Sequence, residues 1–278
     1  MFQSRRQPKD RGGTFKPFAR ALEANAHGIL PRGQTQARLR PREAWNVNLA
    51  ILQARMSSSR LPGKVLAPIL GVPMIGRQVE RLRRSRRIDR LTVATSVHPS
   101  DDDLAAWCEG AGLSVFRGPL DDVLDRFCGV LTDFPQTSTV VRLTADCPLA
   151  DWTVIDQVIA HHAASGADYT NNTTPERTFP HGLDAEAVRP DALRAAWTEA
   201  KDPYEREHVT PFIYRRPDRF RLASVTRAEP RPELRWTVDY PQDLDFVRQV
   251  YDRLYPGDPA FDSEAVIALP VNSAEAPA

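Results

Sequence analysis

The chain has 278 residues, of which 41% are hydrophobic and 26% are charged, and its formal net charge is +1. These proportions are ordinary for a soluble globular protein, and the length suffices for one large domain or two small ones. The longest apolar runs fall far short of the roughly 20 residues that a membrane-spanning helix needs, so we expect no membrane span.

The near-neutral total conceals a basic N-terminal segment. Residues 1–45 contain ten Lys and Arg residues but three acidic ones, and the rest of the chain carries a net negative charge. The segment has no sustained periodicity, no aromatic interleaving and no helical face, so we expect a disordered extension and no nucleic-acid-binding arm. Residues 46–256 are expected to form one folded domain, and residues 257–278 are expected to form a C-terminal tail.

Strand-like and helical patterns alternate from Val47 onward. The predicted strands cover residues 47–53, 91–95, 115–116, 139–143, 184–188, 220–225 and 234–238. The predicted helices begin at Pro73, after a Ser100 cap, at Asp121 or Asp122, at about Asp151, at two places between residues 188 and 220, and at about Pro241. This alternation predicts an α/β fold with an open, mostly parallel sheet and helices on both faces.

Some side chains within these elements receive a structural interpretation. In the helix from Pro73, an apolar stripe predicts that the basic residues face solvent, namely Arg77, Arg81, Arg83 and Arg84. His161 and His162 are expected to be structural helix residues. The three cysteines are odd in number and lack the spacing of a zinc site, which predicts reduced thiols in a cytoplasmic protein.

The loop after the first predicted strand is unusual in composition. In ILQARMSSSRLPGK, three consecutive serines lie between Arg55 and the pair Arg60 and Lys64, and Pro62-Gly63 supplies a turn. Cations on a loop with accessible backbone amides suit a triphosphate, although an ordinary basic surface turn has the same composition. The chain contains neither a P-loop motif nor G-x-G-x-x-G, so a dinucleotide cofactor is not expected.

Two aspartates directly follow predicted strands. Asp146 lies in TADCP and Asp239 lies in WTVDYPQDLDF. Ligands on open α/β sheets bind at the carboxyl ends of strands, where such carboxylates could hold one Mg²⁺ together with substrate phosphates. The alternative for Asp146 is a capping residue before a proline-led turn. A separation above about 8 Å would exclude a shared ion, because Mg²⁺–oxygen bonds are only ~2.1 Å long.

Six motifs, in order, carry a resemblance to a known family. They are QARMSSSRLPGK, GPLDDVLDRF, VRLTADCP, HGLDAE, EREHVTPFI and RWTVDYPQDL, and they span about residues 47–255. Their order resembles the spore-coat polysaccharide cytidylyltransferase-like family, which is related to the cytidylyltransferases that activate acylneuraminate and 3-deoxy-manno-octulosonate. The resemblance implies a nucleotide-diphospho-sugar transferase fold, which is Rossmann-like and GT-A-like, and a homodimer that transfers CMP from CTP for surface polysaccharide synthesis.

The resemblance also implies roles for individual residues. Those implied to be catalytic are Arg55, Lys64, Asp146 and Asp239, and the implied Mg²⁺ ligands are Asp146 and Asp239. Those implied to bind the nucleotide and its phosphates are Gln53, Ala54, Arg55, Ser58, Ser59, Arg60, Lys64, Thr144 and Asp146. Those implied to lie on the acceptor side are Asp122, Asp125, His181, Asp184, Glu186, Glu207 and His208. The acceptor would be a nine-carbon or eight-carbon sugar acid, or a phosphorylated alcohol.

One position departs from the family pattern. Ser57 stands where the family usually has glycine, which lets backbone approach a phosphate closely. We expect serine to be tolerated there, provided that its backbone φ is negative. If it is not tolerated, the chain would be a nucleotide-binding protein without turnover.

A second enzymatic interpretation is a glycosyltransferase that consumes a nucleotide-sugar. Such enzymes use a related fold and hold a metal through a D-x-D motif after a central strand. The segments at residues 101–103 and 243–245 match D-x-D formally, but both lie in predicted helical stretches. The nucleotidyltransferase is therefore the favoured interpretation.

Overall fold

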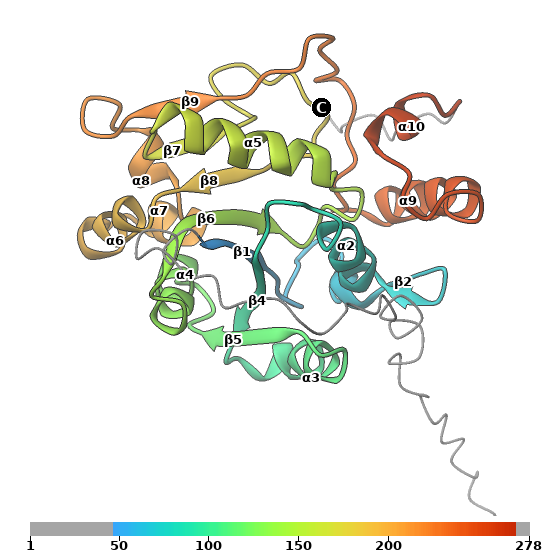
Figure 1. Cartoon of the computed structure of the whole chain (residues 1–278). Helices are drawn as coiled ribbons and strands as arrows, with labels where there is room; N and C mark the ends of the chain where they lie inside the picture. Colours follow the sequence, from blue (N-terminus) through green and yellow to red (C-terminus); the bar gives the residue numbers. More distant parts are fainter. Residues whose placement is uncertain (1–46, 271–278) are drawn as a thin grey trace, which may run out of the picture. The chain divides into compact units, whose positions relative to one another are not determined.

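The computed structural model describes residues 47–270, which fold around one seven-stranded sheet (Figure 1). The expected extension at residues 1–45 lies outside the described residues. The strand order is β5-β4-β1-β6-β8-β7-β9. The strands are β1 (Val47–Gln53), β4 (Arg90–Ser96), β5 (Ser114–Gly118), β6 (Thr137–Thr144), β7 (Tyr169–Asn171), β8 (Glu186–Val188) and β9 (Leu222–Ser224). A separate hairpin pairs β2 (Pro68–Ile69) with β3 (Val72–Pro73).

The sheet is mixed but mostly parallel. β5, β4, β1 and β6 run parallel to one another, with Ala50 of β1 paired to Leu91 on one side and Val141 on the other. β8 runs antiparallel to both β6 and β7, whereas β7 and β9 are parallel. The predicted fold class is therefore confirmed, and β1 and β6 lie side by side with their carboxyl ends at the same edge.

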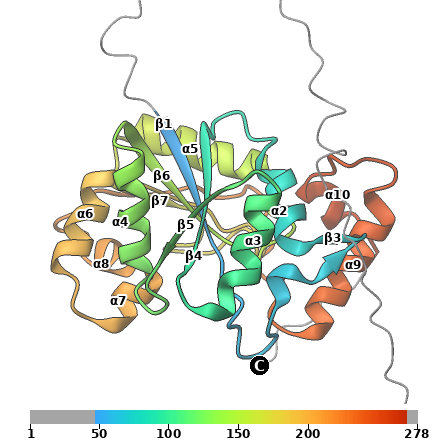
Figure 2. The same ribbon diagram turned by 90° about the horizontal axis from the view of Figure 1, so that it is seen from below.

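Helices cover both faces of the sheet (Figure 2). Alternate residues of β1 separate the two cores, because Leu49 and Ile51 pack in one and Ala50 and Leu52 pack in the other. The first core also receives α4 (Val123–Asp133), α6 (Pro190–Glu199) and α8 (Pro211–Tyr214), and the short α7 (Pro203–His208) lies against α4 and α8. The second receives α2 (Met74–Leu82), α3 (Asp102–Gly110), α5 (Trp152–Ser165), α9 (Pro241–Leu254) and α10 (Ser263–Ile267).

Aspartate side chains cap several of these helices as the sequence predicts. Asp122 accepts a hydrogen bond from Asp125 N at the start of α4, and Asp151 accepts one from Thr153 N at the start of α5. The predicted Ser100 cap is wrong. Ser100 lies within the 3₁₀ turn η4 (Pro99–Asp101), and α3 begins only after it.

The prediction that the α2 arginines face solvent is wrong for Arg77 and Arg81. Arg81 is 2% exposed, donates from Nε to Ala150 O at 2.7 Å, and lies over the Phe261 ring at 4.4 Å. Arg77 is 6% exposed and donates from Nε to Ile69 O. Segments at the C-terminal end of the chain cover this face of α2, so the apolar stripe alone could not show which residues are solvated.

Two strand predictions also differ from the structure. Residues 234–238 do not form a strand, because their hydrogen bonds go to loops: Trp236 N donates to His181 O, and Val238 N donates to Asp146 O. Strand β7 lies in a segment where the sequence predicts no strand. The extended segment at 234–238 nonetheless ties Asp239 to the end of β6.

The expected tail is folded up to residue 270. Its α10 and the preceding loop pack on the second core, where Phe261 is 2% exposed and contacts the Tyr251 ring edge-on at 5.3 Å. We expect Phe261→Ala to lower the free energy of unfolding by about 3 kcal/mol, because it leaves a cavity under Arg81. Urea unfolding tests this, with the exposed Ala268→Ser as a control. A loss below about 1 kcal/mol would contradict the packing role.

His162 is buried as expected of a structural residue, and its Nδ1 lies 2.9 Å from Thr170 Oγ1. Burial lowers the pKa of His162 from 6.5 to about 4. As pH falls, the imidazole of His162 is protonated in the unfolded chain before it is protonated in the folded chain. The contribution of the neutral, buried His162 to stability is therefore complete above pH 6.5 and is lost as pH falls toward 4. Urea unfolding should show about 2 kcal/mol lost between pH 8 and pH 5, absent in His162→Gln and retained in the exposed His161→Gln. Equal pH dependence in both variants would contradict this.

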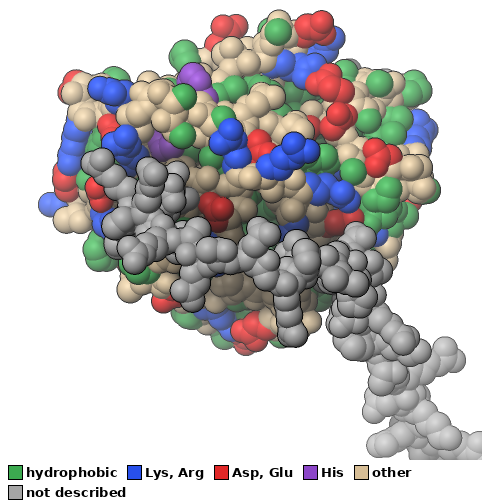
Figure 3. Space-filling model, viewed as in Figure 1, with side chains coloured by type: hydrophobic (Ala, Val, Ile, Leu, Met, Phe, Trp, Pro, Cys, Tyr) green, Lys and Arg blue, Asp and Glu red, His purple; other side chains and the backbone are tan. Residues whose placement is uncertain are grey.

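All three cysteines are free, and Cys108 and Cys147 are buried. Acidic and basic side chains intermingle on the face shown in Figure 3. Within residues 47–270, no helix is both long and apolar enough to cross a membrane.

Candidate active site

The loop after β1 is held by the backbone and by one buried aspartate. Met56 O accepts hydrogen bonds from both Ser58 N and Gly63 N, which folds the serine segment back on itself. Met56 N donates to Asp101 Oδ1 at 2.8 Å, and Asp101 is fully buried below the loop. Gly63 has φ of +73°, which glycine adopts without strain, and the turn there directs Lys64 toward the sheet edge.

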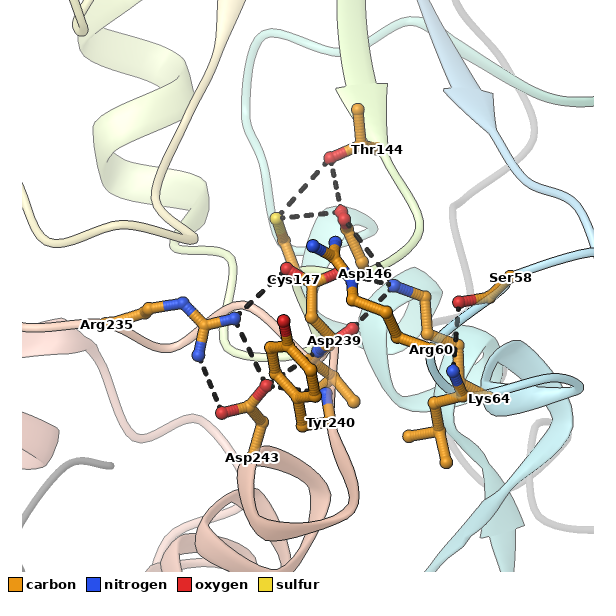
Figure 4. Close-up of polar contacts among 12 residues, drawn as sticks. Ser58, Arg60, Lys64, Thr144, Asp146, Cys147, Arg235, Asp239, Tyr240 and Asp243 are labelled. Carbon is orange, nitrogen blue, oxygen red and sulfur yellow. Dashed lines mark hydrogen bonds and ion pairs between the residues drawn. The ribbon is translucent and has the colours of Figure 1, made fainter. Parts of the chain in front are cut away.

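Lys64 lies between the two predicted metal ligands (Figure 4). Its side chain is 10% exposed, and Nζ donates to Val238 O at 2.6 Å. Nζ is 3.1 Å from Asp239 Oδ1 and 3.8 Å from Asp146 Oδ2. Because both carboxylates lie this close to one ammonium group, their oxygens are less than about 8 Å apart, so the separation that would exclude a shared ion is not reached.

Asp239 receives three cations. Arg60 approaches its Oδ1 at 2.8 Å, Lys64 approaches the same oxygen, and Arg235 donates to Oδ2 at 3.0 Å. Burial alone would raise the pKa of Asp239, but the charges and hydrogen bonds of Lys64, Arg60 and Arg235 outweigh burial and lower it. The Asp239 carboxylate is therefore ionised at neutral pH. Asp243 holds Arg235 in turn, through Nη1 and Oδ1 at 2.7 Å.

Asp146 is less enclosed than Asp239, since 30% of its side chain is exposed. Thr144 Oγ1 donates to its Oδ1 at 2.6 Å, which leaves Oδ2 facing Lys64. Asp146 is partly open to solvent, whereas both oxygens of Asp239 are held by cations that an ion would have to displace. Carboxylate oxygens are nevertheless the hard ligands that Mg²⁺ prefers, and phosphates and water would supply its remaining ligands. The donor set therefore fits the predicted ion.

These residues border a cavity of about 330 Å³ at the carboxyl ends of β1 and β6. All nine residues predicted to bind the nucleotide line it, together with Asp239 and His208. Its lining contains more basic than acidic side chains, and the basic ones are Arg55, Arg60, Lys64, Arg126 and Arg142. Such an excess of positive charge favours a polyanionic ligand.

Two cavity residues escaped the sequence analysis. Arg126 of α4 is 1% exposed, and its Nε and Nη1 have no hydrogen-bond partner among the described residues. Burial lowers the pKa of Arg126 to about 10, so it remains charged at neutral pH. Arg142 of β6 pairs with Glu186 at 2.5 Å. The sequence did carry a signal for Arg142, because an arginine within the apolar TVVRL strand is a charge buried in a sheet, and such a charge needs a partner.

Arg55 and Ser57 lie on the exposed side of the loop. Arg55 pairs with Glu207 of α7 at 3.3 Å, and both side chains are nearly half exposed. Ser57 is exposed and is not among the described residues with positive φ. The backbone there does not require glycine, as expected.

The residues predicted for the acceptor side divide into two groups. Glu186 and His208 line a second cavity, which adjoins the first. The other five predicted residues line neither cavity, namely Asp122, Asp125, His181, Asp184 and Glu207. Asp122 pairs with Arg206 at 2.6 Å, and Asp125 accepts a hydrogen bond from Trp197 Nε1. Their role in acceptor binding stays a prediction.

The first aspartate of each D-x-D segment is buried and already bound by other groups. Asp101 accepts hydrogen bonds from Thr95, Ser96 and Met56 and is fully buried. Asp243 is 3% exposed and is occupied by Arg235 and by the backbone at the start of α9. The geometry therefore gives no support to the glycosyltransferase interpretation.

Comparisons with known proteins agree on one family. The model of the cytidylyltransferase family matches residues 49–255. The spore coat polysaccharide biosynthesis protein SpsF of Bacillus subtilis (strain 168) is 35% identical over 212 residues, which cover 74% of this chain and 86% of SpsF. The 3-deoxy-manno-octulosonate cytidylyltransferase of Sodalis glossinidius is 33% identical over 172 residues, which cover 57% of this chain and 64% of that enzyme.

Solved structures show the same likeness. A cytidylyltransferase from Leptospira borgpetersenii superposes with a TM-score of 0.74 at 28% identity, covering 80% of this chain and 92% of that one. A CMP:2-keto-3-deoxy-manno-octonic acid synthetase solved with CTP superposes with a TM-score of 0.59 at 18% identity, covering 75% and 99%. The second likeness concerns the fold alone.

Proposed function

The chain belongs to the cytidylyltransferase family, and from that membership and the site geometry we propose that it transfers CMP from CTP to a hydroxyl group of a sugar acid or related acceptor. The observation that carries the proposal is the convergence of Lys64, Asp146 and Asp239 at the edge of a cavity rich in arginine. Such a site suits a nucleoside triphosphate, because it places positively charged side chains next to carboxylates that could bind a metal ion.

The proposed reaction forms one bond at phosphorus and breaks another. The acceptor oxygen attacks the α-phosphorus of CTP, the bond from that phosphorus to the bridging oxygen of the β-phosphate breaks, and pyrophosphate leaves with the bonding electrons. The hydroxyl proton is lost to solvent. Arg55, Arg60 and Lys64 hold the triphosphate and offset the charge that develops on the leaving group.

We further propose that Asp146 and Asp239 hold Mg²⁺. The bound ion would supply charge neutralisation on the phosphate oxygens. Lys64 lies within ion-pair distance of both carboxylates in the free protein, and its charge contributes to the lowered pKa of Asp239, which keeps Asp239 ionised before the nucleotide arrives. Arg126 has nitrogens without a hydrogen-bond partner at the cavity wall, so it is a further candidate for donating a hydrogen bond to the nucleotide.

The biological setting of the reaction is also a proposal. The name of the SpsF relative supports a role in surface polysaccharide synthesis. A cytoplasmic location and a homodimer follow from the family resemblance. CTP and a small acceptor would then be the binding partners of the enzyme.

Pyrophosphate release tests the proposed function. The purified full chain is incubated with Mg²⁺ and each of the four nucleoside triphosphates, against a panel of sugar acids and phosphorylated alcohols. We expect release with CTP and at least one acceptor, and its loss in Asp146→Asn. Calorimetry with CTP runs in parallel. Failure of the wild-type protein to bind CTP, or equal release with all four triphosphates, would overturn the proposal.

A further inference from the structure

The segment that connects α2 to β4 carries four exposed arginines, namely Arg83, Arg86, Arg87 and Arg90. None of the four forms an ion pair with a carboxylate of residues 47–270. Other exposed arginines are commonly paired, as Arg219 is with Glu199 at 2.6 Å. Residues 83–90 are called the basic turn below. Its guanidinium groups are available to an external anion.

The backbone of the basic turn is held in one shape by Ser85 and Asp156. Ser85 Oγ accepts hydrogen bonds from Arg87 N at 3.1 Å and from Ile88 N at 3.0 Å, and it donates to Asp156 Oδ1. Arg86 N donates to Asp156 Oδ2 at 3.0 Å. Asp156 belongs to α5, so a neighbouring helix fixes the turn. Both oxygens of this carboxylate bind the hydroxyl and the backbone, which leaves the arginine side chains unpaired.

A groove of about 470 Å³ adjoins the basic turn. Arg86, Arg87 and Trp152 line it, together with Ala160. Trp152 is half-buried at the start of α5, and Arg84 lies over its ring at 5.6 Å. Tryptophan side chains favour the membrane–water interface, where the indole lies at the level of the lipid headgroups. Arginines next to such a ring suit the boundary between lipid phosphates and acyl chains.

The basic turn lies at the edge of the sheet opposite the nucleotide cavity. Arg90 is the first residue of β4 and is paired with Leu49 of β1, whereas the cavity lies at the carboxyl ends of β1 and β6. β4 has seven residues, so the two edges are about 20 Å apart at ~3.3 Å per residue. A partner bound at the basic turn would leave the nucleotide cavity open. Its binding therefore does not depend on the proposed reaction.

The basic N-terminal segment joins the folded body beside this turn. Asn48 Nδ2 donates to Arg87 O at 2.8 Å, and Asp89 N donates to Asn48 O at 3.0 Å. Residues 1–45, which precede this point in the chain, contain ten Lys and Arg residues against three acidic ones. Positive charges that are joined in this way repel one another unless an anion neutralises them, so a shared anionic partner is favoured.

We propose that the basic turn and the adjoining groove dock the protein on a membrane surface that contains anionic phospholipids. Lipid phosphates would pair with the four unpaired arginines, and each cation near such a surface adds to the attraction. Proteins that bind single-stranded nucleic acid use a groove that follows the phosphate backbone and aromatic rings that stack on successive bases. The groove here has one aromatic residue in its lining, Trp152, which favours lipid as the partner.

Vesicle flotation with the full chain tests this proposal. The vesicles contain phosphatidylcholine alone, or phosphatidylcholine and phosphatidylglycerol in a ratio of two to one. We expect binding to the anionic vesicles alone, and its loss in about 1 M salt, where the Debye length is only about 3 Å. A patch variant should bind the anionic vesicles at least about tenfold more weakly, because four surface cations are lost. It carries Arg83→Gln, Arg86→Gln, Arg87→Gln and Arg90→Gln.

A control variant removes the same net charge from another part of the surface. It carries Arg189→Gln, Lys201→Gln, Arg215→Gln and Arg221→Gln, at positions that are exposed and form no ion pair within residues 47–270. We expect it to bind the anionic vesicles as the wild type does, and urea unfolding checks that both variants are folded. Equal binding to neutral vesicles, or an equal loss in both variants, would overturn the docking surface. Displacement of the vesicles by duplex DNA at the same phosphate concentration would overturn the assignment to lipid.

Discussion

Asp239→Asn is expected to lower kcat/KM for CTP at least about 100-fold, the scale on which removing one preorganised charge contact affects a reaction. The substitution keeps the size of the side chain but removes its charge. Lys64, Arg60 and Arg235 then lose the anion that they share. The unpaired cations would still attract the triphosphate, so we expect the loss mainly in kcat, where the proposed binding of Mg²⁺ by this carboxylate would act.

Two measurements accompany this variant. Steady-state pyrophosphate release gives kcat and KM separately, and calorimetry gives the affinity for CTP with and without Mg²⁺. Asp245→Asn is the matched control, because Asp245 lies on α9 near Asp239 but is exposed and paired with Arg248. Retention of more than a tenth of wild-type kcat in Asp239→Asn would contradict a role for this carboxylate in the reaction.

The strands that hold the first cavity could be predicted because their sequences are continuous apolar runs. β1 has the predicted bounds, and β6 extends the predicted run by a few residues. Two aspartates placed directly after strand-like runs could likewise be expected at one sheet edge. For Asp239 the reason was partly wrong, since the segment before it is extended but pairs with loops and not with a strand.

What the sequence could not show depends on partners that are distant along the chain. β7 has only three residues and precedes a polar loop, so periodicity is too short to identify it. Arg81 and Arg126 lie on helices where basic residues are usually solvated, and only the packed structure shows their burial. Residues of β7, β8 and the segment after α7 line the second cavity, and Val209 in that segment has a positive φ that no local pattern predicts.

Lys64→Met is expected to lower the free energy of unfolding by about 2 kcal/mol at pH 7. This is below the 3–5 kcal/mol typical of a broken buried pair, because Asp146 and Asp239 keep some contact with solvent. In the wild type, the lowered pKa of Asp239 contributes stability that is present above pH 3.8 and is lost as pH falls further. Without Lys64, Asp239 loses the cation that contributes most to lowering its pKa, so the pKa of Asp239 rises.

The difference in the free energy of unfolding between the wild type and Lys64→Met should therefore shrink as pH falls from 7 toward 4. Protonation of the unpaired carboxylate relieves the variant at a higher pH than the pH at which protonation destabilises the wild type. Urea unfolding at pH 7, 5 and 4 measures this, with the exposed Lys201→Met as control. A double variant, Lys64→Met with Asp239→Asn, should be more stable at pH 7 than the sum of the single losses predicts, since it removes both the cation and the charge that the cation offsets. A pH-independent loss with additive effects would show that Lys64 acts through packing alone and that the carboxylates do not depend on its charge.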